Sequence, residues 1–229
     1  LALVLAGGWL KDTTESFEAY THQIERRIDE DPHLLGVNDY DYSLFAAVTL
    51  SLERLSKAPA LLMRIFAYFD PEDIWPALIT SLGEQQSRSS PELIDIVEPL
   101  PNTLWSLASD HTAIERAFAE LERRSLIVQM TEHDDFLETG FRMHRLTALV
   151  QRTLLQSDVD FSTIAASVLA VSYPKEPGRR TNWPICARLH PHVAALLSIN
   201  IPLTSAIEKI LELESIWLDF QRRDNVVLE

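Results

Sequence analysis

The segment TAIERAFAELERRSLIVQMTEHDDFLETGFRMHRL, from Thr112 to Leu146, decides the fold. Its first third has apolar residues at Ile114, Phe118 and Leu121, the i, i+4, i+7 spacing of an amphipathic helix. Thr112 and the glutamate three residues later have the form of a capping box at the helix start. The run SLIVQMT is rich in β-formers, and a polar loop with one glycine separates it from a second apolar run, FRM. We therefore predict a helix followed directly by a β-hairpin.

The loop between the two predicted strands is too long for a tight turn and fits the wing of a winged helix. Around this segment the composition is typical of helices, because only 6 of 229 residues are glycine and Leu, Ala, Glu and Arg recur at spacings of three and four. With 46% hydrophobic residues the chain can bury a sizeable core. The predicted fold is mainly α: a helical bundle plus a winged helix with a small two-stranded β-wing, followed by further helices.

Helix-start and helix-stop signals divide the rest of the chain. Asp70-Pro71 has the form of a helix start, with an N-cap residue before a proline, and predicts a short new helix. The polar run GEQQSRSS, Gly83 to Ser90, is expected to be a loop, and Ser90 to restart a helix. The last two helices are expected from Pro191 to Ser198 and from Ser205 to about Arg222.

The first ten residues, LALVLAGGWL, are apolar but too few to span a membrane, and no basic stretch of a signal peptide precedes them. They predict a buried helix that is cut at its beginning. Because the chain starts with Leu1 rather than Met, we expect it to be part of a longer protein. A single cysteine, Cys186, excludes an intramolecular disulfide framework and favours a reducing, cytoplasmic setting.

The charge pattern argues against nucleic acid and anionic membranes as partners, since the net charge is -14. The predicted recognition helix, from Ala113 to Arg124, carries three glutamates and three arginines. The wing adds only acids, so counterion release from DNA would contribute little to binding. These wing acids are Glu132, Asp134, Asp135 and Glu138.

Motifs of catalysis and metal binding are missing from the sequence. It contains no G-x-x-x-x-G-K-[ST], G-x-S-x-G, H-E-x-x-H or paired-cysteine spacing, so we predict a chain that is not an enzyme by itself. Cys186, His190 and His192 could be considered as zinc ligands, but a fourth donor is not evident. We interpret this stretch as a proline-started helix with surface histidines.

The order of these features resembles the C-terminal half of NB-ARC type STAND NTPases, especially fungal relatives of NOD-like receptors. LALVLAGGWL looks like the end of the family's GLPLAL..AG segment, and FRMHRLTALVQRTL looks like its MHD-containing segment. NWPICARLHPHVAALL is similar to the link toward tetratricopeptide repeats. Two departures are that Arg145 stands in place of the motif's aspartate, and that the proline expected near adenine is not in the chain.

The resemblance implies three parts: residues 1–57 as the end of the nucleotide-binding region with an ARC-like helical domain, 58–156 as the winged helix, and 157–229 as a helical linker to repeats. It also implies that His144 faces the β-phosphate of ADP held by an upstream nucleotide-binding domain. An imidazole N–H at a strand end can donate to such an oxygen. The alternative is that His144 only caps the hairpin and hydrogen-bonds to backbone.

We expect a non-catalytic regulatory segment of an innate-immune type signalling ATPase, which controls a nucleotide-dependent closed-to-open switch. Its partners would be the upstream nucleotide-binding domain and a downstream repeat sensor, with oligomerisation of the whole protein possible in principle. This segment alone would bind no cofactor, and ADP or ATP would come through the upstream domain. Two alternatives remain: a freestanding helical protein-interaction adaptor and a winged-helix DNA-binding protein.

Overall fold

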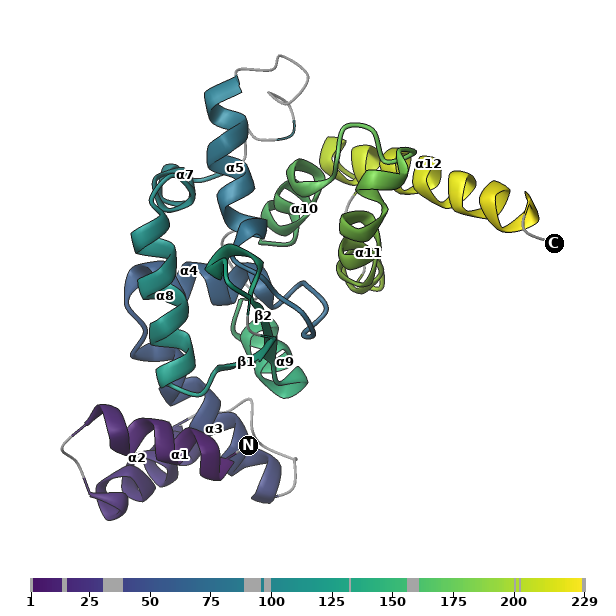
Figure 1. Ribbon diagram of the computed structural model, residues 1–229. Helices are drawn as coiled ribbons and strands as arrows, with labels where there is room; N and C mark the ends of the chain where they lie inside the picture. The colour runs from purple at the N-terminus through teal and green to yellow at the C-terminus, as the bar shows by residue number, and fades with distance from the viewer. Residues whose placement is uncertain are drawn as a thin grey trace.

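The computed structural model describes residues 2–13, 16–30, 39–88, 96, 100–131, 133–155, 161–199, 201 and 203–227. It is mainly helical with one small antiparallel sheet of two strands in the described ranges, as the sequence predicted (Figure 1). Three groups of helices follow each other along the chain, and Figure 1 places them at the bottom, in the middle and at the upper right. One continuous hydrophobic core runs through all three groups.

The N-terminal group consists of α1 (Ala2–Asp12), α2 (Phe17–Glu30) and α3 (Asp39–Glu53), which pack on one another. The rings of Trp9 and Tyr20 lie 5.3 Å apart, and the Arg54 guanidinium stacks over Trp9. The N-terminal stretch is helical, as predicted, but it is only half buried. Leu5 is inside the core, whereas Val4 is 53% exposed.

The central group is the winged helix. It contains α4 (Lys57–Phe66), α5 (Ala77–Arg88), α7 (Asn102–Ala108), α8 (His111–Arg123) and α9 (Arg145–Leu154). The hairpin consists of β1 (Ile127–Thr131) and β2 (Gly140–Met143), with a 3₁₀ turn at Phe136–Glu138 in the wing. The helix followed by a hairpin is therefore confirmed. Phe118 of α8 holds this group together, because its ring packs on Phe66, Phe136 and Phe141 at 5.7, 5.9 and 4.9 Å.

The predicted helix at Asp70-Pro71 is wrong. The Asp70 carboxylate accepts a hydrogen bond from the Glu72 amide at 2.9 Å, which closes a turn instead of starting a helix. The chain then bends through Asp73 to Ile74, whose N–H and C=O both bond to Phe141 at 2.8 and 2.7 Å. The segment thus occupies the place of a third strand beside β2, and α5 begins only at Ala77.

Two further helix boundaries differ from the prediction. Asp110, not Thr112, caps α8, because its carboxylate accepts from the Ala113 amide at 3.0 Å. The expected loop from Gly83 is wrong, since α5 continues to Arg88. A Cβ at Gly83 would lie 2.6 Å from the Ala108 carbonyl oxygen, so the glycine permits close packing of α5 on α7. The predicted helix start at Ser90 lies outside the described residues.

The C-terminal group consists of α10 (Phe161–Ser172), the turn Arg180–Asn182, α11 (Trp183–Leu197) and α12 (Ser205–Val227). The start of α12 is confirmed. Helix α11 starts eight residues earlier than predicted, because Pro184 lies in its first turn and Pro191 is inside it. Among the described helices, none combines the length and apolar composition that would let it cross a bilayer.

Candidate functional site

His144 lies at the joint between β2 and α9, where it is the N-cap residue of the helix. The Leu146 amide donates to its Nδ1 at 3.2 Å, and the Thr147 amide donates to its backbone carbonyl at 2.8 Å. Because Nδ1 accepts a hydrogen bond, the ring proton of the neutral imidazole sits on Nε2. His144 therefore caps α9 with one ring nitrogen and has an N–H donor on the other.

The strand that carries His144 is fixed by the segment before α5. Besides the pair of bonds between Ile74 and Phe141, the Met143 amide donates to the Pro71 carbonyl at 2.8 Å. On its other side β2 pairs with β1, with Ile127 opposite Met143. The last residue before His144 is thus bonded to a backbone on one side and paired on the other, which sets the direction of the imidazole.

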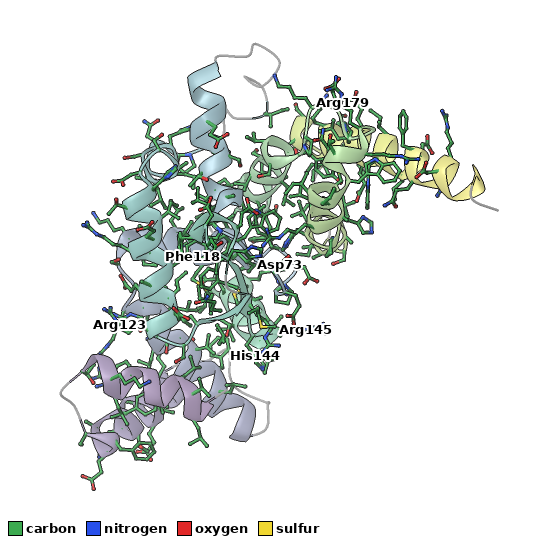
Figure 2. The ribbon with its side chains drawn as sticks, in the orientation of Figure 1. Asp73, Phe118, Arg123, His144, Arg145 and Arg179 are labelled. Atoms are coloured by element: carbon green, nitrogen blue, oxygen red, sulfur yellow. The ribbon has the colours of Figure 1, made fainter. Side chains whose placement is uncertain are left out.

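An open groove of about 400 Å³ surrounds His144. Residues from α1, the segment before α5, the connection from α8 to β1, both strands and the start of α9 contribute to it. They are Val4, Glu72, Ser125, Leu126, Val128, Arg142, Met143, His144 and Arg145. Figure 2 shows His144 and Arg145 close together at the lower edge of the winged helix, above the N-terminal helices.

The groove carries positive charge on a molecule that is acidic overall. Partial burial and the neighbouring Arg142 lower the pKa of His144 below its ordinary 6.5, so the ring is neutral near pH 7. Arg142 is 3.9 Å from Glu72, and Arg145 has no ion-pair partner among the described residues. One imidazole N–H donor and two guanidinium groups are suited to an anionic ligand.

The three candidate zinc ligands do not face a common point, and each has its own partner or is buried. Cys186 is fully buried, and burial raises the pKa of its thiol to about 11. His190 Nδ1 lies 2.5 Å from a carboxylate oxygen of Glu214, while His192 Nε2 lies 3.3 Å from the Asp73 carbonyl. In the described part of the chain, no three His, Cys, Asp or Glu side chains are grouped as metal ligands.

The interpretation of both histidines as surface residues is wrong for His192, which is 0% exposed. Its ring packs between Phe69 and Trp75, with ring centroids 5.5 Å apart in each case. The sequence pattern does not indicate this burial, because a helix that starts at Pro191 would leave His192 in its first turn at the surface. With Pro191 inside α11 instead, His192 lies on the buried face with Leu189 and Val193.

The sequence pattern did not identify one residue that contacts this region. Arg188 of α11 contacts both Asp73 and Glu138, and Asp73 lies 115 positions away in the chain. The only signal was a single arginine within the otherwise apolar run WPICARL. Such a cation needs a partner when a helix is buried, but the sequence does not show which acid supplies it.

Comparisons of the chain with protein-family models, with curated proteins and with solved structures found no match.

Proposed function

We propose that this chain is the non-catalytic regulatory segment of a STAND-type signalling ATPase. In this proposal His144 contacts a phosphate of ADP that an upstream nucleotide-binding domain holds, and the contact favours a closed state. Replacing ADP by ATP removes or changes that contact, so the population shifts toward an open state. The residues that would meet the nucleotide are His144 and, beside it, Arg142 and Arg145.

The observation that carries the proposal is the hydrogen bonding of the imidazole. Since Nδ1 accepts the Leu146 amide, the neutral ring presents an Nε2–H donor at the edge of an open groove. Capping and phosphate contact are therefore compatible roles of one side chain. A hydrogen bond to a phosphate oxygen becomes stronger when the ring is protonated, and an anion at the groove favours that protonation.

Support for movement comes from what we call the N-terminal junction, the contacts of α1–α3 and of the α3–α4 connection with α8 and α9. In the connection, Ser56 is the N-cap residue of α4, and Glu120 of α8 accepts hydrogen bonds from its amide at 2.9 Å and its hydroxyl at 2.6 Å. The hydroxyls of Thr49 in α3 and Thr147 in α9 are buried without a hydrogen-bond partner in the described residues. Unsatisfied groups of this kind weaken an interface, which suits one that opens.

What we call the C-terminal junction, the contacts of α10 and α11 with α4, α5 and the wing, combines the apolar packing of α10 with the ion pairs of Arg188 to Asp73 and Glu138. Ten of the twelve residues of α10 are buried. The Ser172 hydroxyl donates to the Leu78 carbonyl at 3.2 Å, and Phe161 lies under the Arg64 guanidinium of α4. In the proposed switch, the winged helix and the C-terminal helices therefore move together.

The test uses the longer protein that contains both this chain and the nucleotide-binding domain. We expect His144→Ala to increase the ADP dissociation rate and to raise signalling in the absence of a trigger. The measurements are release of a fluorescent ADP analogue and the activity of the effector. His111→Ala is the matched control, because His111 is exposed at the start of α8, away from the groove.

Unchanged ADP release and unchanged activity in His144→Ala would reject the phosphate contact. An upstream coding sequence without G-x-x-x-x-G-K-[ST] would reject the STAND assignment itself. We expect the isolated 229 residues to show neither ATP hydrolysis nor salt-dependent DNA binding. Salt-dependent binding would favour the winged-helix DNA-binding alternative instead.

A second candidate function, the helical adaptor, is favoured by one apolar surface. Between α11 and α12 lies an open hollow that includes Leu197, Leu203 and Leu211, which are 39%, 70% and 42% exposed. Exposed leucines gathered in one hollow are typical of a protein contact. The regulatory proposal expects the same surface to contact a repeat domain, so a downstream sequence without repeats of roughly 34 to 42 residues would favour the adaptor.

A further inference from the structure

Arg188 joins helix α11 to two segments next to β2, the strand that precedes His144. Its Nε and Nη2 donate to the two carboxylate oxygens of Asp73 at 2.7 and 2.8 Å. Its Nη1 donates to a carboxylate oxygen of Glu138 at 3.0 Å, and Nη2 also donates to the Glu138 carbonyl at 3.1 Å. We call this set of contacts the Arg188 clamp. The planar fork of a guanidinium fixes the relative orientation of the groups that it bonds.

The Arg188 guanidinium is covered on one face by an aromatic ring, while the side chains of Asp73 and Glu138 are about half exposed. The guanidinium lies 4.0 Å from the centre of the Trp75 ring, and the Arg188 side chain is only 19% exposed. One turn later, the buried His192 packs on the same Trp75, and its Nε2 donates to the Asp73 carbonyl at 3.3 Å. Helix α11 thus holds Asp73 by its carboxylate and by its backbone. Figure 2 places Asp73 between the winged helix and the C-terminal helices.

Asp73 has an unusual backbone conformation, with φ at 51°. A left-handed conformation is unfavourable for a residue with a Cβ, and it persists where the surroundings hold it. Here the surroundings are Arg188 and His192. The conformation turns the chain so that the next residue, Ile74, meets Phe141 of β2.

Both acids of the Arg188 clamp lie in segments next to β2. Asp73 precedes the bridge to Phe141, and Glu138 lies two residues before β2 begins. The strand then runs from Gly140 to Met143 and ends at His144. A displacement of α11 would therefore displace the segments of Asp73 and Glu138, and with them β2.

We propose that Arg188 is a positioning residue that couples the C-terminal helices to His144 through β2. A signal received by α11 and α12 would then alter the placement of the imidazole without any direct contact. This inference rests on the proposed role of His144 at the nucleotide. Its test is nevertheless made on this chain alone, so that the two can fail separately.

The experiment compares Arg188→Ala, Arg188→Lys and the unchanged chain by amide hydrogen exchange and by NMR titration of the His144 ring. Arg180→Ala is the matched control, because Arg180 pairs with Asp224 within the C-terminal group. Arg188→Lys keeps the charge but loses the fork, so it is the second variant if Arg188→Ala does not fold.

We expect Arg188→Ala to speed exchange of the Ile74, Phe141 and Met143 amides by about tenfold while α8 amides change little. We also expect the pKa of His144 to move toward its ordinary 6.5, since partial burial is the main cause of its lowering and a displaced ring would be more exposed to water. Arg188→Lys should give a smaller change in the same direction. Arg180→Ala should give neither effect.

Equal acceleration of all amides, or an unmoved His144 titration in a folded Arg188→Lys or Arg188→Ala variant, would overturn the coupling. It would leave Arg188 as a stabilising residue only. If the coupling is observed here but His144→Ala leaves ADP release unchanged in the longer protein, the proposed function fails and the mechanical link stands.

Discussion

The two junctions on either side of the winged helix are built differently. At the N-terminal junction Glu120 accepts hydrogen bonds from Ser56, and two threonine hydroxyls are buried without a hydrogen-bond partner among the described residues. At the C-terminal junction the mostly apolar helix α10 covers α4 and α5, and Arg188 is paired with two acids, while the Nδ1 of His192 is buried without a partner in the described part of the chain. Interfaces with satisfied polar groups and more apolar burial are more stable. In the proposed switch, the winged helix therefore stays with the C-terminal helices and separates from α1–α3.

The largest effect is expected from Phe161→Ala in α10. The Phe161 ring is buried at the C-terminal junction, and its truncation should cost about 3–5 kcal/mol of unfolding free energy. Denaturant titration with fluorescence detection should show one weakened transition that includes the winged helix. The matched control is Phe17→Ala, because Phe17 is 56% exposed on α2 and should cost under about 1 kcal/mol. A separate transition of α10–α12 alone would show that these helices unfold independently of the winged helix.

Acid should weaken the C-terminal junction first. Burial lowers the pKa of His192 to about 4, so between pH 6.5 and 4 the unfolded chain takes up a proton at this residue that the folded chain does not. Stability at this site is therefore lost as the pH falls through that window, by about 3 kcal/mol at most. His192→Gln should flatten the pH dependence of the denaturation midpoint there. His111→Gln, an exposed control, should retain the slope, and an equal flattening in both variants would contradict the assignment.

Glu120→Gln should loosen the N-terminal junction by about 1 kcal/mol. Burial alone would raise the pKa of Glu120, but hydrogen bonds from Ser56 and the charges of Arg124 and Arg123 lower it below 4.5. Its contribution is thus complete above pH 4.5 and disappears as the pH falls through the lowered pKa. Hydrogen exchange of α1–α3 should accelerate without a change in α10. Glu115→Gln, on the exposed face of α8, is the control, and acceleration of α10 would argue against two separate bodies.

The smallest effect is expected from Thr147→Val. The variant replaces an unpaired buried hydroxyl by a methyl group of similar size, so it should be neutral or stabilise by up to about 1 kcal/mol. Thr153→Val is its control, because the Thr153 hydroxyl is exposed and donates to the Leu149 carbonyl. Thermal denaturation measures both. A clear loss of stability in Thr147→Val would mean that this hydroxyl has a partner in solution.

The sequence was sufficient where spacing and local signals act together. The helix with Ile114, Phe118 and Leu121 and the hairpin that follows need only neighbours in the chain, and both were predicted. The strand-like segment at Ile74 could not be predicted, since Asp70-Pro71 is a good helix start and only pairing with Phe141 overrides it. The continuation of α5 past Gly83 likewise depends on α7, which is far in sequence.

The residues of the candidate site also differ in whether the sequence could predict them. His144 was evident because an ionisable residue stood where a strand gives way to a helix. Its hydrogen bond to the Leu146 amide, which fixes the ring proton on Nε2, required the local geometry. Arg188 was not evident, because its partners Asp73 and Glu138 come from distant segments that only the fold brings together.

Native-state hydrogen exchange at increasing denaturant distinguishes a winged helix that moves with the C-terminal helices from one that moves with α1–α3. We predict that amides of α4, α5, α8 and α10 share one opening free energy, and that those of α1–α3 exchange through a smaller opening of lower free energy. A single value for all helices, or an opening shared by α1–α3 and the winged helix while α10–α12 exchange separately, would contradict this prediction.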